Sequence, residues 1–147
     1  METTARRVLE FMDNRVVVLV GGAETAGQYC LLHVTTPPGG GGNTLHTDAF
    51  NETFYILDGE HEFTVERDGA LATWRPAPGE AVHIPHTARH KFTCVGARPG
   101  HMLAAAAPAF EAFFRALAAA NPGGYDPATT PGRTGPVFAR FGVRFFA

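Results

Sequence analysis

The chain has only two cysteines, Cys30 and Cys94, among 147 residues. Two cysteines are too few to form a disulfide framework. Both fall inside apparent strands, where cysteine behaves as a small buried hydrophobe. We therefore expect reduced thiols and a cytoplasmic location.

The chain also lacks long hydrophobic runs, and its net charge is small. The apolar run at residues 16–20 is far shorter than the roughly 20 residues that cross a bilayer, and no signal-peptide pattern precedes it. The formal net charge is only −2, and no basic cluster stands out, so there is no electrostatic basis for binding nucleic acid or an anionic membrane. The sequence predicts a soluble, unprocessed protein.

Glycine and proline are plentiful, with 17 and 11 residues, and short apolar runs lie between them. This pattern is typical of many short strands joined by turns, and the length suits one domain. Residues 1–15 are expected to form a short helix or an arm. Helical spacing of apolar residues predicts a helix over residues 109–120, followed by a loop over 125–136. Strands are expected at residues 16–20, 28–36, 54–58, 60–66, 70–75, 80–84, 92–95 and 101–107.

The stretch from Gly42 to Gly59 places one imidazole and two carboxylates, those of His46, Asp48 and Glu52, within seven residues. On an extended strand these side chains face the same way, because side chains alternate with period two. They would then converge on one point, which is a metal-site geometry short of one ligand. His90, in a second turn-rich segment, is the candidate for that ligand.

Together the two segments resemble the two motifs of the cupin superfamily. The first motif reads Gly, then His-x-His, three or four residues, Glu, six residues and Gly, and residues 52–59 have the expected spacing. The second reads Gly, five residues, Pro-x-Gly, two residues and His, and Gly79, Pro85 and His90 match it. The resemblance covers residues 27–108 and is to small monocupins of the quercetin-dioxygenase-like type.

Two positions depart from the family pattern: Asp48 stands where the second histidine would be, and Thr87 stands where a glycine would be. The resemblance implies an all-β fold, a double-stranded β-helix of the jelly-roll class with a C-terminal helix. One cupin domain would span residues 1–147, with a barrel core at about 16–107 and a C-terminal helix and tail at 109–147. A homodimer is the usual form of the family.

The resemblance also implies a divalent metal ion, Fe, Mn, Ni or Zn, held by His46, Asp48, Glu52 and His90. Two histidines and one carboxylate form the pattern of non-heme ferrous iron. A second carboxylate makes the ligand set harder, which favours manganese, ferrous iron or magnesium over copper and nickel. The alternative is that Asp48 marks a site that has lost its metal.

Glu52 is also the candidate catalytic residue, because in oxygenase members of the family the matching glutamate takes a proton from the bound substrate. No Lys or Arg cluster lies beside the ligands, so the site suits a flat aromatic or polyketide-like molecule better than a sugar phosphate. Tyr29 and Trp74 are further candidates for the wall of the pocket. The main apolar wall is expected from Phe54, Ile56, Val82, Ile84 and Phe92.

The other histidines are expected to lie outside the metal site. His33 either lines the cavity or sits outside it, His61 is expected to be a hydrogen-bonded core residue, and His83 should point away. His86 is either an exposed loop residue or a replacement ligand. The phenylalanines within residues 109–120 are expected to pack against the barrel rather than bind a ligand.

Two functions follow from these observations. The first is a metal-dependent, dioxygenase-like oxidoreductase that inserts oxygen into a small aromatic or enolisable substrate, such as a flavonol or polyketide. The second is a non-oxidative cupin isomerase or cyclase, or a small-molecule-binding module. A phosphate-binding role for the glycines at residues 39–42 is disfavoured, because no helix with a Lys-Ser/Thr start follows them.

Overall fold

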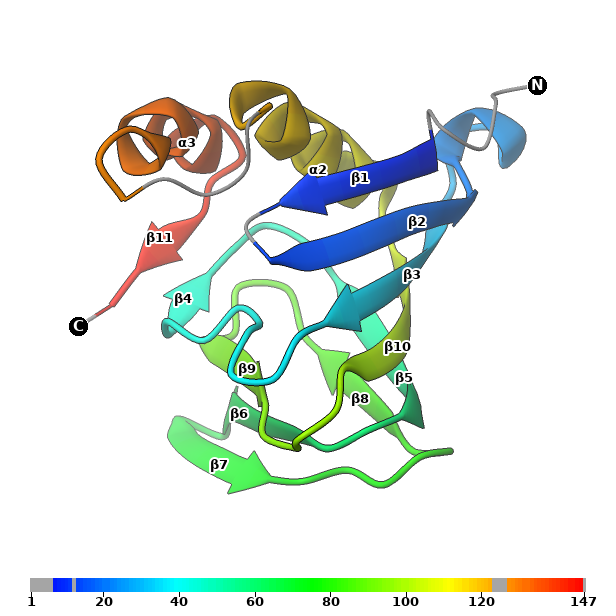
Figure 1. The fold of residues 1–147 in the computed structure, drawn as a ribbon. Coiled ribbons are helices and arrows are strands. Elements are labelled where there is room, and N and C mark those ends of the chain that lie inside the picture. The colour runs from blue at the N-terminus through cyan, green and yellow to red at the C-terminus, as the bar shows by residue number, and fades with distance from the viewer. Residues whose placement is uncertain (1–6, 12, 123–126, 147) are drawn as a thin grey trace.

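A computed structural model describes residues 7–11, 13–122 and 127–146 of the chain, and it consists mainly of two antiparallel sheets (Figure 1). The six-stranded sheet contains, in order, β1 (Val8–Phe11), β2 (Asn14–Val20), β3 (Cys30–Thr36), β10 (Gly100–Ala106), β5 (Glu52–Asp58) and β8 (Ala81–Ile84). The five-stranded sheet contains β11 (Arg144–Phe145), β4 (His46–Thr47), β9 (His90–Cys94), β6 (His61–Arg67) and β7 (Ala70–Trp74). The all-β jelly-roll architecture with a C-terminal helix is confirmed.

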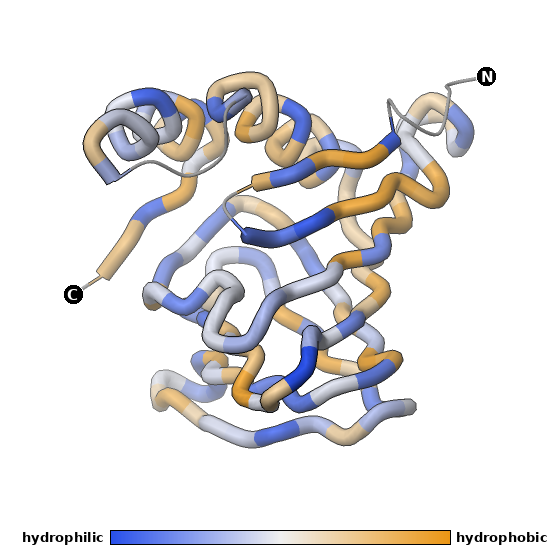
Figure 2. The backbone as a smooth tube through the Cα atoms, viewed as in Figure 1, coloured by the Kyte–Doolittle hydropathy of each residue, from blue (hydrophilic) through white to orange (hydrophobic). Residues whose placement is uncertain are grey.

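The core lies between the two sheets, and alternating side chains build it. In β3 the residues Cys30, Leu32, Val34 and Thr36 are buried, while the residues between them are half-buried on the other face. Figure 2 shows β2 changing from hydrophilic at its start to hydrophobic along the rest of the strand. The alternation along β3 has the period of two residues that is expected when one face of a sheet is buried.

Two helices follow the last long strand and pack at one end of the sandwich (Figure 1). The first, α2 (Pro108–Ala120), begins with proline in its first turn, where the missing N–H costs no hydrogen bond. It packs against β1 and β3, and a second helix packs against it. A short 3-10 helix, η1 (Gly22–Glu24), lies between β2 and β3.

The second helix, α3 (Thr130–Arg140), lies where we expected the last part of a loop over residues 125–136, so that expectation is wrong from residue 130 onward. Residues 125 and 126 lie outside the described part of the chain. Its sequence contains two glycines and two prolines, which disfavour an isolated helix. Packing against α2 supplies the missing stability, as tertiary contacts do for most short helices. The hydroxyl of Thr134 also donates a hydrogen bond to the carbonyl of Thr130 at 3.0 Å.

Residues 8–11 form a strand, which corrects that part of the helix or arm expected over residues 1–15. β1 pairs antiparallel with β2, from Val8 opposite Val17 to Phe11 opposite Asn14. This pairing extends β2 to Asn14, two residues earlier than expected from its apolar run. Residues 1–6 lie outside the described part of the chain.

Two further expectations concern cysteine and the membrane. Cys30 and Cys94 are both buried and unpaired among the described residues. Of the helices that the structure describes, none has the length and apolar character needed to cross a bilayer.

The end of the sandwich opposite the helices encloses His61, the first residue of β6. His61 is fully buried, as expected for a core histidine, but neither ring nitrogen has a hydrogen-bond partner among the described residues. Burial lowers the pKa of His61, and nearby His101 lowers it further, which keeps the ring neutral. The ring lies directly against Gly100, where a β-carbon would come within 2.3 Å of Nε2.

We expect Gly100→Ala to destabilise the protein by about 1–3 kcal/mol, because the new methyl group overlaps the His61 ring inside a packed core. Urea unfolding followed by circular dichroism measures the change. The matched control is Gly132→Ala in α3, where an added β-carbon meets nothing within 4 Å. An equal loss of stability in both variants would contradict the assigned contact.

Candidate metal centre

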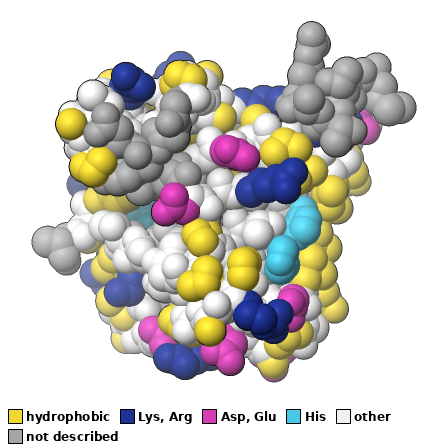
Figure 3. Space-filling model, in the orientation of Figure 1, with side chains coloured by type: hydrophobic (Ala, Val, Ile, Leu, Met, Phe, Trp, Pro, Cys, Tyr) yellow, Lys and Arg dark blue, Asp and Glu magenta, His cyan; other side chains and the backbone are white. Residues whose placement is uncertain are grey.

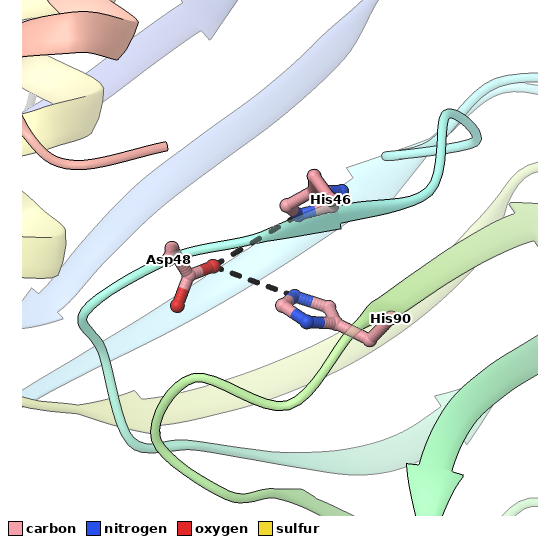
Figure 4. Close-up of side chains that lie close together, drawn as sticks. All are labelled: His46, Asp48 and His90. Atoms are coloured by element: carbon pink, nitrogen blue, oxygen red, sulfur yellow. Dashed lines mark ion pairs between the residues drawn. The ribbon is translucent and has the colours of Figure 1, made fainter. Parts of the chain in front are cut away.

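Three side chains with metal-binding atoms meet between the sheets (Figure 4). His46 lies on β4 and His90 is the first residue of β9, and the two pair directly across the antiparallel ladder. Asp48 follows β4 by one residue. The potential ligand atoms of His46, Asp48 and His90 all lie within 4.8 Å of one another.

Asp48 reaches this point by a turn and not by strand alternation. β4 ends at Thr47, so the expected continuous extended strand from His46 to Glu52 is wrong. The backbone N–H of Phe50 donates to Oδ1 of Asp48 at 3.0 Å, a local bond typical of aspartate in turns. This bond leaves Oδ2 directed at the two histidines (Figure 4).

The distances between the three groups suit a shared ion. Oδ2 of Asp48 lies 3.4 Å from Nε2 of His90 and 3.9 Å from Nε2 of His46. Ligand atoms that each lie about 2.1 Å from one ion are at most about 4.2 Å apart, and both distances fall inside this limit. Two imidazoles and one carboxylate suit a divalent ion in their chemistry, and the two distances from Asp48 allow it to share an ion with either histidine.

Backbone carbonyls orient both imidazoles. Nδ1 of His46 lies 2.7 Å from the carbonyl oxygen of Thr44, and Nδ1 of His90 lies 2.9 Å from that of Ala88. A carbonyl only accepts, so each Nδ1 carries the proton, and each Nε2 presents its lone pair to the site. This arrangement is typical of histidines that bind metals.

The pKa of His46 is lowered by burial and by the neighbouring His90. A lowered pKa keeps the imidazole unprotonated near neutral pH, which is the form that binds a metal.

Glu52, the first residue of β5, lies beside the three groups and is buried. Its Oε2 is 3.6 Å from Nε2 of His90, and its carboxyl is close enough to that of Asp48 for the two groups to affect each other's ionisation. Burial, together with the negative charge of Asp48, raises the pKa of Glu52 well above its usual value. Burial also opposes ionisation of Asp48, but the neighbouring His90 and Glu52 side chains and the hydrogen bond from the backbone N–H of Phe50 hold its pKa below the usual value.

A cavity of about 560 Å³ opens onto these residues. Its volume lies in the range of about 300–1,000 Å³ that is typical of small-molecule sites. Among the described residues, no Lys or Arg lines it, and its few polar groups include Asn14, Thr130 and Thr134. Most of its wall is apolar, and its aromatic part comes from Phe11, Phe54, Phe92, Phe110, Phe113, Phe114, Phe138 and Phe145.

Two of the five expected wall residues, Phe54 and Phe92, line this cavity. The other three, Ile56, Val82 and Ile84, do not, which corrects that expectation. Each is almost completely buried in the core. The two sheets pack directly against each other at these positions and leave no space for a ligand.

Neither Tyr29 nor Trp74 lines the cavity, although both were candidates for its wall. Tyr29 precedes β3, and half of its surface is exposed. Trp74 ends β7 at the edge of the five-stranded sheet, where the guanidinium of Arg67 lies 5.3 Å from its ring centre.

The remaining histidines lie away from the cavity. His33 is half-buried on the outer face of β3, which settles the choice left open for it. His83 is exposed and its Nδ1 lies 3.0 Å from the hydroxyl of Thr53. His86 is exposed in the loop before β9, where its backbone N–H donates to the side chain of Asn51.

Sequence reasoning missed the aromatic wall that α2, α3 and β11 supply. Phe110 and Phe113 do pack against the barrel, as expected, but they also face the cavity. Phe145 on β11 lies with its ring centre 5.9 Å from that of His46. The signal available in the sequence was the concentration of phenylalanine in residues 110–146.

The sequence matches the Cupin domain family over residues 32–106, just over half of the chain. This protein is a cupin. No curated protein matches it. The family assignment agrees with the two motifs and with the two-sheet sandwich, and the matched range contains all four candidate site residues.

Solved structures show the same fold. Oxalate oxidase in complex with glycolate is 22% identical with a TM-score of 0.54, over 65% of this cupin and 51% of the oxidase chain. Oxalate decarboxylase from Bacillus subtilis is 22% identical with a TM-score of 0.57, over 67% and 26%. The polyketide cyclase RemF from Streptomyces resistomycificus is 20% identical with a TM-score of 0.57, over 74% and 80%. The matched part thus spans about half of the oxidase chain and a quarter of the decarboxylase chain.

Proposed function

We propose that this cupin is a divalent-metal enzyme that acts on a flat, enolisable aromatic or polyketide-like molecule. The observation that carries the proposal is the position of His46, Asp48 and His90 in the wall of a mostly apolar cavity that is rich in phenylalanine. That combination places polar, metal-binding chemistry at one point of an otherwise apolar pocket, which is typical of catalytic sites.

His46, Asp48 and His90 are the residues that would hold the ion. When bound, a divalent ion acts as a Lewis acid that polarises a ketone or phenol oxygen. The carboxylate of Asp48 in place of an imidazole favours the harder ions manganese and iron among Fe, Mn, Ni and Zn. One study of the Bacillus subtilis oxalate decarboxylase concerns Mn(II) centres, which supports manganese as the first ion to test.

Glu52 is the proposed general base, and its position beside the three ligands favours this role over that of a fourth ligand. Its raised pKa makes the ionised carboxylate a stronger base than an exposed glutamate. In this form Glu52 accepts the proton of a phenol or of a carbon next to a ketone.

The lining of the cavity favours an aromatic substrate over a small dicarboxylate such as oxalate. Aromatic rings pack favourably against phenylalanine side chains, as Phe54 and Phe92 do in a tilted pair with ring centres 5.9 Å apart. Two carboxylates in one pocket need cationic partners, and no Lys or Arg is found among the described lining residues. The side chains of Asn14 and Thr134, which line the cavity, offer hydrogen bonds to hydroxyl groups of a substrate.

Oxygen insertion is the first candidate reaction. The enolate or phenolate formed by proton transfer to Glu52 would react with dioxygen, and both oxygen atoms would enter the product. Cyclisation without an oxidant is the second candidate, in which the same enolate attacks another carbonyl of the substrate. The overlap with RemF, which covers most of both chains, supports this second reaction.

Measuring turnover with and without oxygen distinguishes the two reactions. Protein loaded with Mn²⁺ or Fe²⁺ is incubated with a panel of flavonols and aromatic polyketides, while an electrode records oxygen. An oxygenase consumes one O₂ per product and stops in anaerobic buffer, whereas a cyclase continues at the same rate. Metal content that stays unchanged when His46 and His90 are both replaced by alanine would contradict either function. Homodimer formation and a cytoplasmic location stay predictions.

A further inference from the structure

The outer face of the six-stranded sheet carries a second pair of histidines. His33 on β3 and His101 on β10 lie on neighbouring strands, and Nε2 of His33 is 3.2 Å from Nδ1 of His101. Their ring centres are 5.3 Å apart. Figure 3 shows histidine side chains side by side at the surface over β3 and β10, with a Lys or Arg side chain close to them and hydrophobic side chains along one side.

The sheet itself separates this pair from the cavity. His33 is opposite Leu103 and His101 is opposite Thr35 in the β3–β10 ladder, so the two histidines are diagonal neighbours on one face. Met102, the residue next to His101, points the other way and is completely buried in the core. The His33–His101 pair is therefore independent of the site at His46 and His90.

The surroundings keep at least one of the two rings neutral. Burial, nearby His101 and the positive charge of Arg15 all lower the pKa of His33. The hydroxyl of Thr35 lies 3.3 Å from Nδ1 of His101 and adds an oxygen beside the pair. The His33 nitrogen, which shares a hydrogen bond with His101, and the Thr35 oxygen thus both lie within 3.3 Å of Nδ1 of His101.

We propose that His33 and His101 form a chelating pair for a Zn²⁺, Cu²⁺ or Ni²⁺ ion on the outer face of the sheet. Two nitrogens 3.2 Å apart subtend an angle of roughly 100° at an ion about 2.0–2.1 Å from each, which is close to tetrahedral. Imidazole suits these ions, whereas the carboxylate at the inner site favours harder ones. The hydroxyl of Thr35 and water complete the coordination.

An ion at this position joins two central strands of the six-stranded sheet. β3 and β10 are adjacent over their full lengths and are both neighbours of strands that carry the core. An ion that binds only the folded chain stabilises it by mass action. Zinc at a concentration well above its dissociation constant should therefore raise the melting temperature, without any role in the reaction.

The test is a Zn²⁺ titration of the whole chain by calorimetry, repeated with Cu²⁺ and electron paramagnetic resonance. We expect two ions per wild-type chain, and one in His33→Gln, in His101→Gln and in the double variant. Loss of either imidazole should weaken the outer site at least about 10-fold. The His46→Ala/His90→Ala variant should keep the outer ion and its Cu²⁺ spectrum.

The matched control is His83→Gln, because His83 is an exposed histidine on the same outer face, without a second imidazole beside it among the described residues. It should bind as many ions as the wild type. The proposal is overturned if the double variant at His33 and His101 keeps both ions, or if His83→Gln loses one as well. The variants at His33, His101 and His83 change only half-buried or exposed positions, so each of these proteins is expected to fold.

Discussion

Replacing His90 by alanine should lower kcat/KM by at least about 1,000-fold and release the divalent ion from the inner site. His90 is the ligand candidate that contacts both acidic groups, at 3.4 Å from Asp48 and 3.6 Å from Glu52. Its loss leaves only two of the three candidate ligands. Lewis-acid catalysis contributes several kcal/mol, and each 1.4 kcal/mol corresponds to a factor of ten in rate. Steady-state kinetics and metal analysis after dialysis measure both effects.

His86→Ala is the control for this experiment, because His86 lies four residues earlier and is exposed. It should retain both the ion and the activity, and a loss of metal there would identify His86 as a ligand. Because His90 is buried, His90→Gln is made alongside it to preserve the packing. A folded His90→Gln variant with full metal content and normal turnover would refute the proposed site.

The second large effect is expected for Glu52→Gln, which should lower kcat by about 100- to 10,000-fold while the ion stays bound. Glutamine has the shape of glutamate and, like a protonated carboxyl, can donate a hydrogen to the neighbouring Asp48. It cannot accept a proton from the substrate. Kinetics and metal analysis on the same preparation therefore separate a base from a ligand.

Glu62→Gln serves as the comparison, since Glu62 lies on the surface in an ion pair with Arg75 and far from any proposed chemistry. Its kinetics should match those of the wild type. If Glu52→Gln keeps kcat within about threefold, the base lies elsewhere. If the ion is lost together with the activity, Glu52 is a ligand instead.

The meeting of His46, Asp48 and His90 could be anticipated from the sequence, because fixed spacings between glycine, proline and histidine fix the lengths of the strands and turns that bring the two segments together. The route taken by Asp48 could not. The chain bends after β4, where the N–H of Phe50 donates a hydrogen bond to the side chain of Asp48, and the pattern of apolar residues does not predict such a bond. The three side chains do meet, but the strand alternation that was expected to bring Asp48 there is wrong.

The wall of the cavity was harder to predict than its polar residues. α3 contains Gly132, Gly135 and Pro136, so local preference indicates a loop, and only the packing against α2 makes it a helix. Alternation along a strand says which face a residue occupies but not how deep it lies. Ile56 and Phe54 share a face of β5, yet only Phe54 reaches the cavity.

The strand β11 is held to β4 by two residue pairs and one further backbone bond, from the N–H of Phe146 to the carbonyl of Leu45. Phe145 of this strand lies opposite His46 and also forms part of the cavity wall. A displacement of β11 would therefore disturb both the cavity wall at Phe145 and the backbone pairing of His46, a candidate metal ligand. Under the proposed function, substrate binding and metal retention would both depend on this short strand, and a substrate that packs against Phe145 would stabilise its pairing with β4.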